Sequence, residues 1–138
     1  MKAQQYHTPN FGKTIFSASF LFLATGLWAA SPPTDILLSN NVVAENQPAG
    51  TTVGTLFVVD PDPGGNHTYA LVSGTGDADN GAFSIDNDLL LTTVSFNYEV
   101  KNNYSLRIRC TDNQGLWVEE AFTVDVSNVN EPPEDIVF

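Results

Sequence analysis

The stretch YSLRIRCT, residues 104–111, decides the fold class of this chain of 138 residues. Its apolar residues, at positions 104, 106, 108 and 110, alternate with polar or charged ones, and AFTVDVS, residues 121–127, alternates in the same way. A period of two places one row of side chains in a core and the other row in water, as in an antiparallel sheet. These two segments therefore predict β-strands with one buried face.

Outward from these segments, the chain consists of short β-type runs separated by turn clusters rich in Gly, Pro, Asn and Asp. No stretch keeps a 3.6-residue apolar period for three turns, so helices are not expected. Seven strands in about 100 residues predict an all-β, seven-stranded Greek-key β-sandwich with an immunoglobulin-like architecture. The expected strands are residues 35–44, 53–60, 67–73, 82–86, 89–94, 104–111 and 118–127.

Residues 1–30 differ in character from the rest of the chain. Lys2 and Lys13 precede an apolar run, TIFSASFLFLATGLW, residues 14–28. Small residues follow this run before the first carboxylate. This pattern is typical of a secretory signal peptide. An uncleaved anchor is the alternative, although a membrane span needs about 20 apolar residues. We expect export to the extracellular space or the cell surface. Association with a membrane through a region beyond Phe138 is a second possibility.

The residues after position 30 are strongly acidic. They hold all 16 acidic residues and only three basic ones, Lys101, Arg107 and Arg109, so their formal net charge is −13. Nucleic acids and anionic membranes are poor partners for such a surface, whereas cations are natural ones. A solvated acidic surface without a bound cation is the alternative.

A short internal repeat indicates how the chain is organised. PPTDI, residues 32–36, recurs as PPEDI, residues 132–136, after a shift of 100 residues. This spacing equals one sandwich domain, which is typical of a tandem array. We predict a repeat over residues 32–131 and the start of a second, truncated repeat over residues 132–138.

Polar residues follow the strands in two groups. If consecutive strands run up and down, residues 45–46, 97–99 and 128–131 lie at one end, called here the C-terminal pole. Asp60, Asp62 and Asp112 then lie at the opposite end, the N-terminal pole. Calcium takes six to eight oxygen ligands, and a single pole does not offer that many. We therefore predict calcium sites where two sandwiches stack end to end. The ordinary preference of Asp and Asn for turns is the alternative explanation.

Short motifs in a characteristic order resemble those of the cadherin repeat family, and the resemblance spans residues 32–133. The motifs are AEN (44–46) for the family's PEN, VVDPDPGGN (58–66) for DxD with its Asn, FNYE (96–99) for LDxE, CTDNQG (110–115) for xDxxG, and NVNEPP (128–133) for the linker DxNDNxP. The opening PPTDILLS and the loop GDADNGAFSID, residues 76–86, look more like bacterial cadherin-like repeats than animal ones.

The resemblance implies a seven-stranded sandwich that binds Ca²⁺ between repeats and supports homophilic or heterophilic adhesion. The residues implied for a joint to the next repeat are Glu45, Glu99, Asn128, Asn130 and Glu131. Those implied for a joint to a preceding repeat are Asp60, Asp62, Asn66 and Asp112. Asn97 and Asn128 stand where the family usually has Asp, so a lower calcium affinity is expected. Asn97, Asp77 and Asp79 are weaker metal candidates.

Other chemistries find little support in the sequence. His67 has no partner motif for catalysis and is interpreted as a surface residue, so no enzyme activity is expected. Cys110 is the only cysteine, which excludes an intramolecular disulfide. The expected partners are neighbouring repeats of the same chain, and a surface protein or a glycan. The alternative function is a carbohydrate-binding or spacer sandwich attached to a secreted enzyme.

Overall fold

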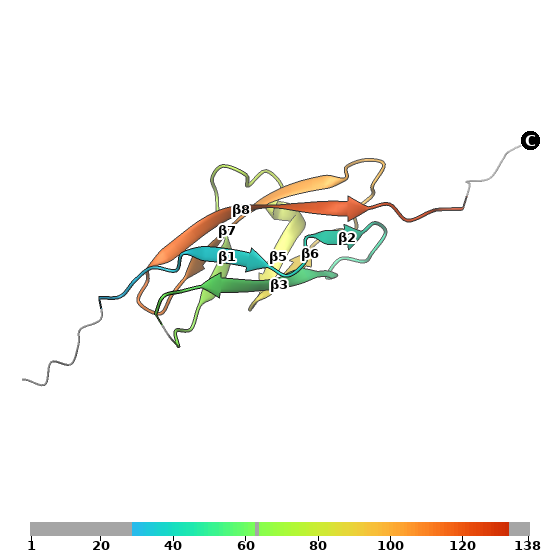
Figure 1. The fold of residues 1–138 in the computed structure, drawn as a ribbon. Helices are drawn as coiled ribbons and strands as arrows, with labels where there is room; N and C mark the ends of the chain where they lie inside the picture. The colour runs from blue at the N-terminus through green and yellow to red at the C-terminus, as the bar shows by residue number, and fades with distance from the viewer. Residues whose placement is uncertain (1–28, 63, 133–138) are drawn as a thin grey trace, which may run out of the picture.

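The chain folds into two four-stranded sheets that face each other (Figure 1). The computed structural model describes residues 29–62 and 64–132. One sheet has the strand order β1-β3-β6-β5 and the other has the order β2-β8-β7-β4. The strands are β1 (Asp35–Leu38), β2 (Val42–Ala44), β3 (Thr52–Val59), β4 (Thr68–Leu71), β5 (Phe83–Asp86), β6 (Leu89–Thr92), β7 (Asn103–Thr111) and β8 (Trp117–Ser127), with one 3₁₀ turn, η1 (Asn80–Ala82). The predicted all-β sandwich is confirmed.

The longest strand pair, β7 and β8, arises from the alternation that the sequence displays. The two strands pair antiparallel without interruption from Asn103 opposite Asp125 to Thr111 opposite Trp117. Leu106, Ile108 and Cys110 point inward and are fully buried, while their polar neighbours are less buried. This hairpin therefore supplies one continuous wall of the core.

The predicted first strand, residues 35–44, is divided between the two sheets. β1 pairs antiparallel with β3, whereas β2 pairs parallel with β8. The Asn40 side chain stabilises the crossing, because its Nδ2 donates hydrogen bonds of 2.7 Å to the carbonyls of Val42 and Val53. Gly54 lies directly against this bend, since a Cβ at Gly54 would stand 2.5 Å from the Asn40 carbonyl oxygen. The structure thus has eight strands where seven runs were expected.

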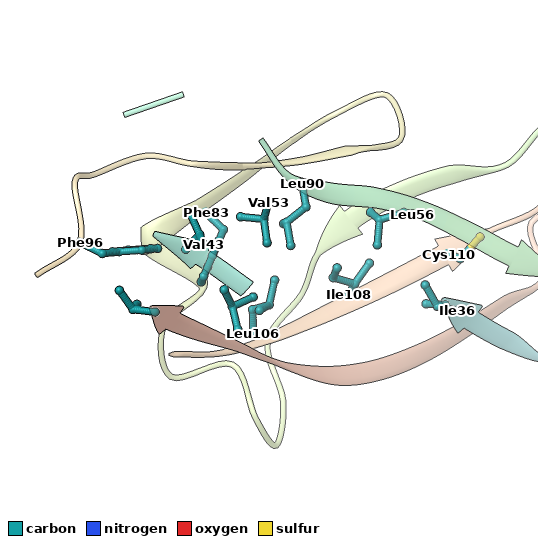
Figure 2. Packing of buried hydrophobic residues seen from close by; sticks show 12 residues of the cluster. Ile36, Val43, Val53, Leu56, Phe83, Leu90, Phe96, Leu106, Ile108 and Cys110 are labelled. Atoms are coloured by element: carbon teal, nitrogen blue, oxygen red, sulfur yellow. The ribbon is translucent and has the colours of Figure 1, made fainter. Parts of the chain in front are cut away.

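The core lies between the sheets and is wholly apolar at its centre (Figure 2). Leu90 from β6 and Leu106 and Ile108 from β7 are completely buried. At one end of the core, Phe83, Phe96 and Tyr104 form an aromatic cluster, in which the rings of Phe96 and Tyr104 stack at 4.1 Å between centroids. Burial of such side chains contributes about 1.5–3 kcal/mol each, which makes this layer the main source of stability.

The described chain enters and leaves the sandwich at opposite ends of its long axis (Figure 1). This arrangement is compatible with domains joined end to end. Residues 1–28 of the predicted signal peptide and residues 133–138 of the predicted second repeat lie outside the described residues. No helix within residues 29–62 and 64–132 is long and apolar enough to cross a membrane.

Candidate functional site

The C-terminal pole is organised around Glu45, which follows β2. Its side chain is 0% exposed, although it carries a carboxylate. Oε2 accepts the N–H of Tyr98 at 2.9 Å, and Oε1 accepts the N–H of Val129 at 2.8 Å. The backbone N–H of Glu45 donates to the Ser127 carbonyl at 3.1 Å. One carboxylate therefore connects three segments: the end of β2, the loop after β6 and the chain that leaves β8.

Two further contacts connect the same segments at the surface. Asn128 Nδ2 donates to Glu99 Oε1 at 2.9 Å, and Asn46 Nδ2 donates to Glu131 Oε1. Glu99, Asn128 and Glu131 are all exposed. The structure thus brings together the segments at 45–46, 97–99 and 128–131, as the strand directions predict.

Asn97 and Asn130 occupy different settings within this pole. The Oδ1 of Asn97 accepts the N–H of Val100 at 3.0 Å, so it closes the turn that presents Glu99. Asn130 is exposed between Val129 and Glu131. Asn97 therefore has a local structural role whether or not a cation binds.

The electrostatics of Glu45 favour its charged form. The pKa of its carboxyl group is lowered below 4.5 by the N–H groups of Val129 and Tyr98, which outweigh the cost of burial. None of the ion pairs among the described residues involves Glu45, so the two backbone N–H groups, and to a smaller extent a hydrogen bond with the Glu99 side chain, stabilise the charge. This leaves a negative centre beneath the exposed carboxylates of the pole.

At the N-terminal pole, the carboxylates of the DPD stretch bond to nearby groups. Asp60 Oδ1 accepts the N–H of Asp62 at 2.8 Å, and Asp60 Oδ2 lies 2.7 Å from His67 Nε2. Asp62 Oδ2 accepts the N–H of Ser31 at 2.7 Å, which ties the incoming chain to this loop. The His67 hydrogen bond, together with the Asp62 N–H, lowers the pKa of Asp60.

His67, which is expected at the surface, is only partly exposed there. Its side chain is only 13% exposed and lies against Asp60. The loop between β3 and β4 folds back on itself, so residues seven positions apart meet. A sequence pattern gives no signal for this contact, because the loop has no regular period.

Asp112, which follows β7, is the most deeply buried acid of the N-terminal pole. It is 7% exposed, and its Oδ1 accepts the N–H groups of Gln114 and Leu116, both at 2.8 Å. Its Oδ2 is buried without a hydrogen-bond partner among the described residues.

Two other residues lie near the acids of this pole. Burial, together with the nearby charges of Asp60 and Asp112, raises the pKa of the Cys110 thiol to about 11. Asn66, the remaining residue predicted at this pole, is exposed in the same β3–β4 loop as Asp60.

Asp77 and Asp79 hold the long loop between β4 and β5. Asp77 Oδ2 accepts the N–H of Gly74 at 2.9 Å, and Asp79 Oδ2 accepts the N–H of Ser105 at 2.8 Å. The other Asp79 oxygen pairs with the Lys101 ammonium group. A lysine already neutralises this site, and its role as a minor cation site stays a prediction.

The described residues include no group of three or more His, Cys, Asp or Glu side chains that is close enough to hold a metal ion by itself. Two features nevertheless suit a hard cation with oxygen ligands: the unpartnered buried Oδ2 of Asp112 and the buried charge of Glu45, which has no basic partner. The oxygen donor set of both poles is of the kind that calcium prefers. The residues present therefore fit a calcium site that further ligands would have to complete.

The sequence and the fold of this chain are similar to those of known proteins. The cadherin domain family matches residues 40–127. Mouse cadherin-23 is 37% identical over 93 residues, which are 64% of this chain and 3% of that protein. Human protocadherin-16 is 34% identical over 112 residues, which are 78% of this chain and 3% of that protein. The chain thus spans about 3% of the length of these relatives.

A solved structure of mouse cadherin-23, repeats EC22-24, superposes with a TM-score of 0.53 at 29% identity and covers 68% of this chain and 31% of that one. These relatives are animal proteins, so they do not support the bacterial character that the opening PPTDILLS and residues 76–86 suggested. Since the family match extends over more than half of the sequence and over most of the sandwich, the chain belongs to the cadherin domain family.

Proposed function

We propose that this domain is a calcium-stiffened repeat of a secreted or cell-surface protein that acts in cell or surface adhesion, homophilic or heterophilic. The observation that carries the proposal is the Glu45 carboxylate, buried and charged at the pole where the chain leaves the sandwich. Two N–H groups already keep this carboxylate ionised, but among the described residues it has no basic partner. A cation at this pole would supply the opposite charge.

The ligand set proposed for the joint to a following repeat is Glu45, Glu99, Asn128, Asn130 and Glu131, with Asn97 as a weaker member. The exposed carboxylates of Glu99 and Glu131 accept hydrogen bonds from the amide side chains of Asn128 and Asn46. Calcium, when bound, would supply positive charge that neutralises carboxylates of both domains. The loss of two carboxylates through Asn97 and Asn128 predicts a weaker site than a full acidic set would make.

The ligand set proposed for the N-terminal pole is Asp60, Asp62, Asn66 and Asp112. The free Oδ2 of Asp112 supports this assignment, since a buried oxygen without a donor is destabilising. Asp60 already has His67 as a partner, and this contact would compete with a cation. We therefore propose that this pole binds calcium less readily than the C-terminal pole.

The proposed organisation is a repeat over residues 32–131, followed by the start of another at 132, after a signal peptide over residues 1–30. Entry and exit at opposite ends of the sandwich support end-to-end stacking (Figure 1). The proposed partners are neighbouring repeats and a surface protein or a glycan. The relatives named above are cadherins and protocadherins, which supports adhesion as the biological role.

The test is the thermal stability of the purified chain during titration with calcium from micromolar to millimolar concentrations, with magnesium as the control ion. A ligand that binds the folded state raises the melting temperature by mass action. We expect a rise with calcium that Glu99→Gln combined with Glu131→Gln reduces. A melting temperature that stays constant over this range, in the wild type and in a longer protein containing the next repeat, contradicts the proposal.

A further inference from the structure

A cleft opens between the two sheets on the side away from β1 and β2. Its volume is about 290 Å³. It is lined by His67, Thr68, Tyr69, Ile85, Asn87 and Asp88. This volume lies just below the range of roughly 300–1,000 Å³ for ligand pockets, so the cleft suits one side chain better than a large ligand.

The cleft lies where both sheets have a free edge. β4 is the last strand of one sheet, and β5 is the last strand of the other. Tyr69 stands opposite Cys110, and Ile85 stands opposite Leu90, so both side chains come from the inward rows of their strands. They provide an apolar and aromatic floor that the sandwich leaves uncovered at its open side.

The rim of the cleft is polar. Asn87 takes a left-handed conformation with φ of 55° in the β5–β6 turn and precedes Asp88, and both residues are exposed. On the other side stands His67, with the carboxylate of Asp60 2.7 Å behind its Nε2. Burial, with the nearby Asp88 charge as a smaller cause, raises the pKa of Tyr69 to about 12, so its ring stays neutral.

No lysine or arginine of residues 29–62 and 64–132 lines this cleft. The three basic residues of the described chain have partners elsewhere: Lys101 pairs with Asp79, and both Arg107 and Arg109 pair with Glu119. The Asp88 carboxylate takes part in no ion pair among the described residues. An aromatic floor beside an unpaired carboxylate, in a strongly acidic domain, is a complementary environment for a cation.

We propose that this cleft binds a basic side chain, arginine or lysine, presented by an extended segment of a partner protein. The charged group lies against the ring of Tyr69 and pairs with Asp88, while the amide of Asn87 accepts a further hydrogen bond. The free edges of β4 and β5 offer unpaired backbone groups to the segment that carries the side chain. The site goes beyond the proposed calcium joints, because none of its lining residues belongs to either calcium ligand set. It borders the N-terminal pole, where His67 bonds to Asp60.

The test is an NMR titration of the ¹⁵N-labelled chain with N-acetyl-arginine amide and with the uncharged N-acetyl-citrulline amide. We expect saturable shifts of the amides of residues 67–69 and 85–88 with the arginine probe and none with citrulline. Asp88→Asn should weaken the binding by roughly twofold to fivefold, which corresponds to an exposed ion pair. Asp86→Asn is the matched control in the same hairpin, since Asp86 does not line the cleft.

Several results would overturn the proposal: equal shifts with both probes, shifts spread over acidic residues around the whole surface, or equal binding by the Asp88→Asn variant with an unchanged melting temperature. Saturable shifts of the cleft residues with methyl mannoside instead of arginine would assign the cleft to a saccharide and also contradict it. The titration is repeated with EGTA and with calcium. Arginine binding that is equal in both conditions separates this site from the calcium joint, so either can fail alone.

Discussion

The Oε1 of Glu45 accepts the N–H of Val129 at 2.8 Å across 84 residues of sequence. The same carboxylate holds the Tyr98 N–H through its other oxygen, 53 residues away. These two bonds close the pole of the sandwich from which the chain continues. This buried side chain therefore helps to set the conformation of the predicted linker at residues 128–131, together with the surface bonds of Asn128 to Glu99 and of Asn46 to Glu131.

Replacement of Glu45 should loosen this pole. Glu45→Ala leaves the partly buried N–H groups of Tyr98 and Val129 without their acceptors, so the melting temperature should fall by several degrees. Glu45→Gln keeps one acceptor oxygen and should have a smaller effect. Thermal unfolding followed by circular dichroism checks the order, with Glu131→Gln as an exposed control. An Ala variant as stable as the wild type would contradict the role assigned to the two hydrogen bonds.

Acid should destabilise the fold through a defined set of carboxylates. Glu45, Asp60, Asp79 and Glu119 have folded-state pKa values below their ordinary values of 4.5 or 3.8. A lowered pKa contributes stability that is present above the ordinary value and is lost as the pH falls through the folded-state value. We expect the melting temperature to drop steeply below pH 4.5. Glu119→Gln should flatten part of this decline, because Glu119 pairs with Arg107 and Arg109.

Glu120 should show the opposite dependence on pH. It lies on the inward row of β8 opposite Ile108, and burial together with the neighbouring Asp35 carboxyl group raises its pKa above 4.5. A raised pKa contributes stability that is full below pH 4.5 and is lost as the pH rises through the folded-state value. Glu120→Gln should therefore raise the melting temperature at neutral pH, whereas Glu119→Gln should lower it.

Melting curves of these two neighbouring variants at neutral pH and at pH 4 provide the check. The advantage of Glu120→Gln over the wild type should shrink in acid, since the wild-type carboxyl group is then protonated. A Glu120→Gln variant that is less stable than the wild type at neutral pH would show that the hydrogen bond from the Ile36 N–H to the carboxylate outweighs the cost of burial and the effect of Asp35.

The crossing between β1 and β2 should tolerate no side chain at Gly54. Gly54→Ala places a Cβ 2.5 Å from the Asn40 carbonyl oxygen and should destabilise the fold by roughly 1–3 kcal/mol. Gly81→Ala meets no atom within 4 Å and should be neutral or stabilising by up to about 1 kcal/mol. Urea unfolding of both variants measures the difference, and equal stabilities would mean that the bend can shift to make room.

A cavity in the core should cost more than a surface deletion of the same size. Leu90 is fully buried between the sheets, so Leu90→Ala should lose about 2–5 kcal/mol of unfolding free energy. Leu37 is 48% exposed on the outer face of β1, and Leu37→Ala should change stability by roughly 0.5 kcal/mol or less. Chemical denaturation would contradict the description of the core if the two losses were alike.

Much of the fold could be predicted from local pattern. The alternation in residues 104–111 and 121–127 is a property of neighbouring residues, and it predicts β7 and β8 because a strand has a period of two. The division of residues 35–44 could not be predicted in this way. It depends on Asn40 bonding to Val53, a residue of another strand, and on the space that Gly54 leaves.

The candidate site could be predicted only in part, because strand direction follows from local pattern whereas contacts between loops do not. The direction of successive strands correctly placed segments 45–46, 97–99 and 128–131 at one end of the sandwich. The burial of Glu45 and the pairing of Asp60 with His67 were not foreseen, because both arise when loops fold against each other. The calcium role of these residues stays a prediction that the titration above tests.

The sequence by itself determined that this chain is an all-β sandwich with a group of acidic and amide residues at each pole, since period and turn chemistry are local properties. Only the tertiary structure decided which of those acids are buried, which are already bonded to protein groups, and where a cleft remains. Burial and hydrogen bonding depend on groups that are distant along the chain, such as Glu45 and Val129, and these meet only when the two sheets close on each other.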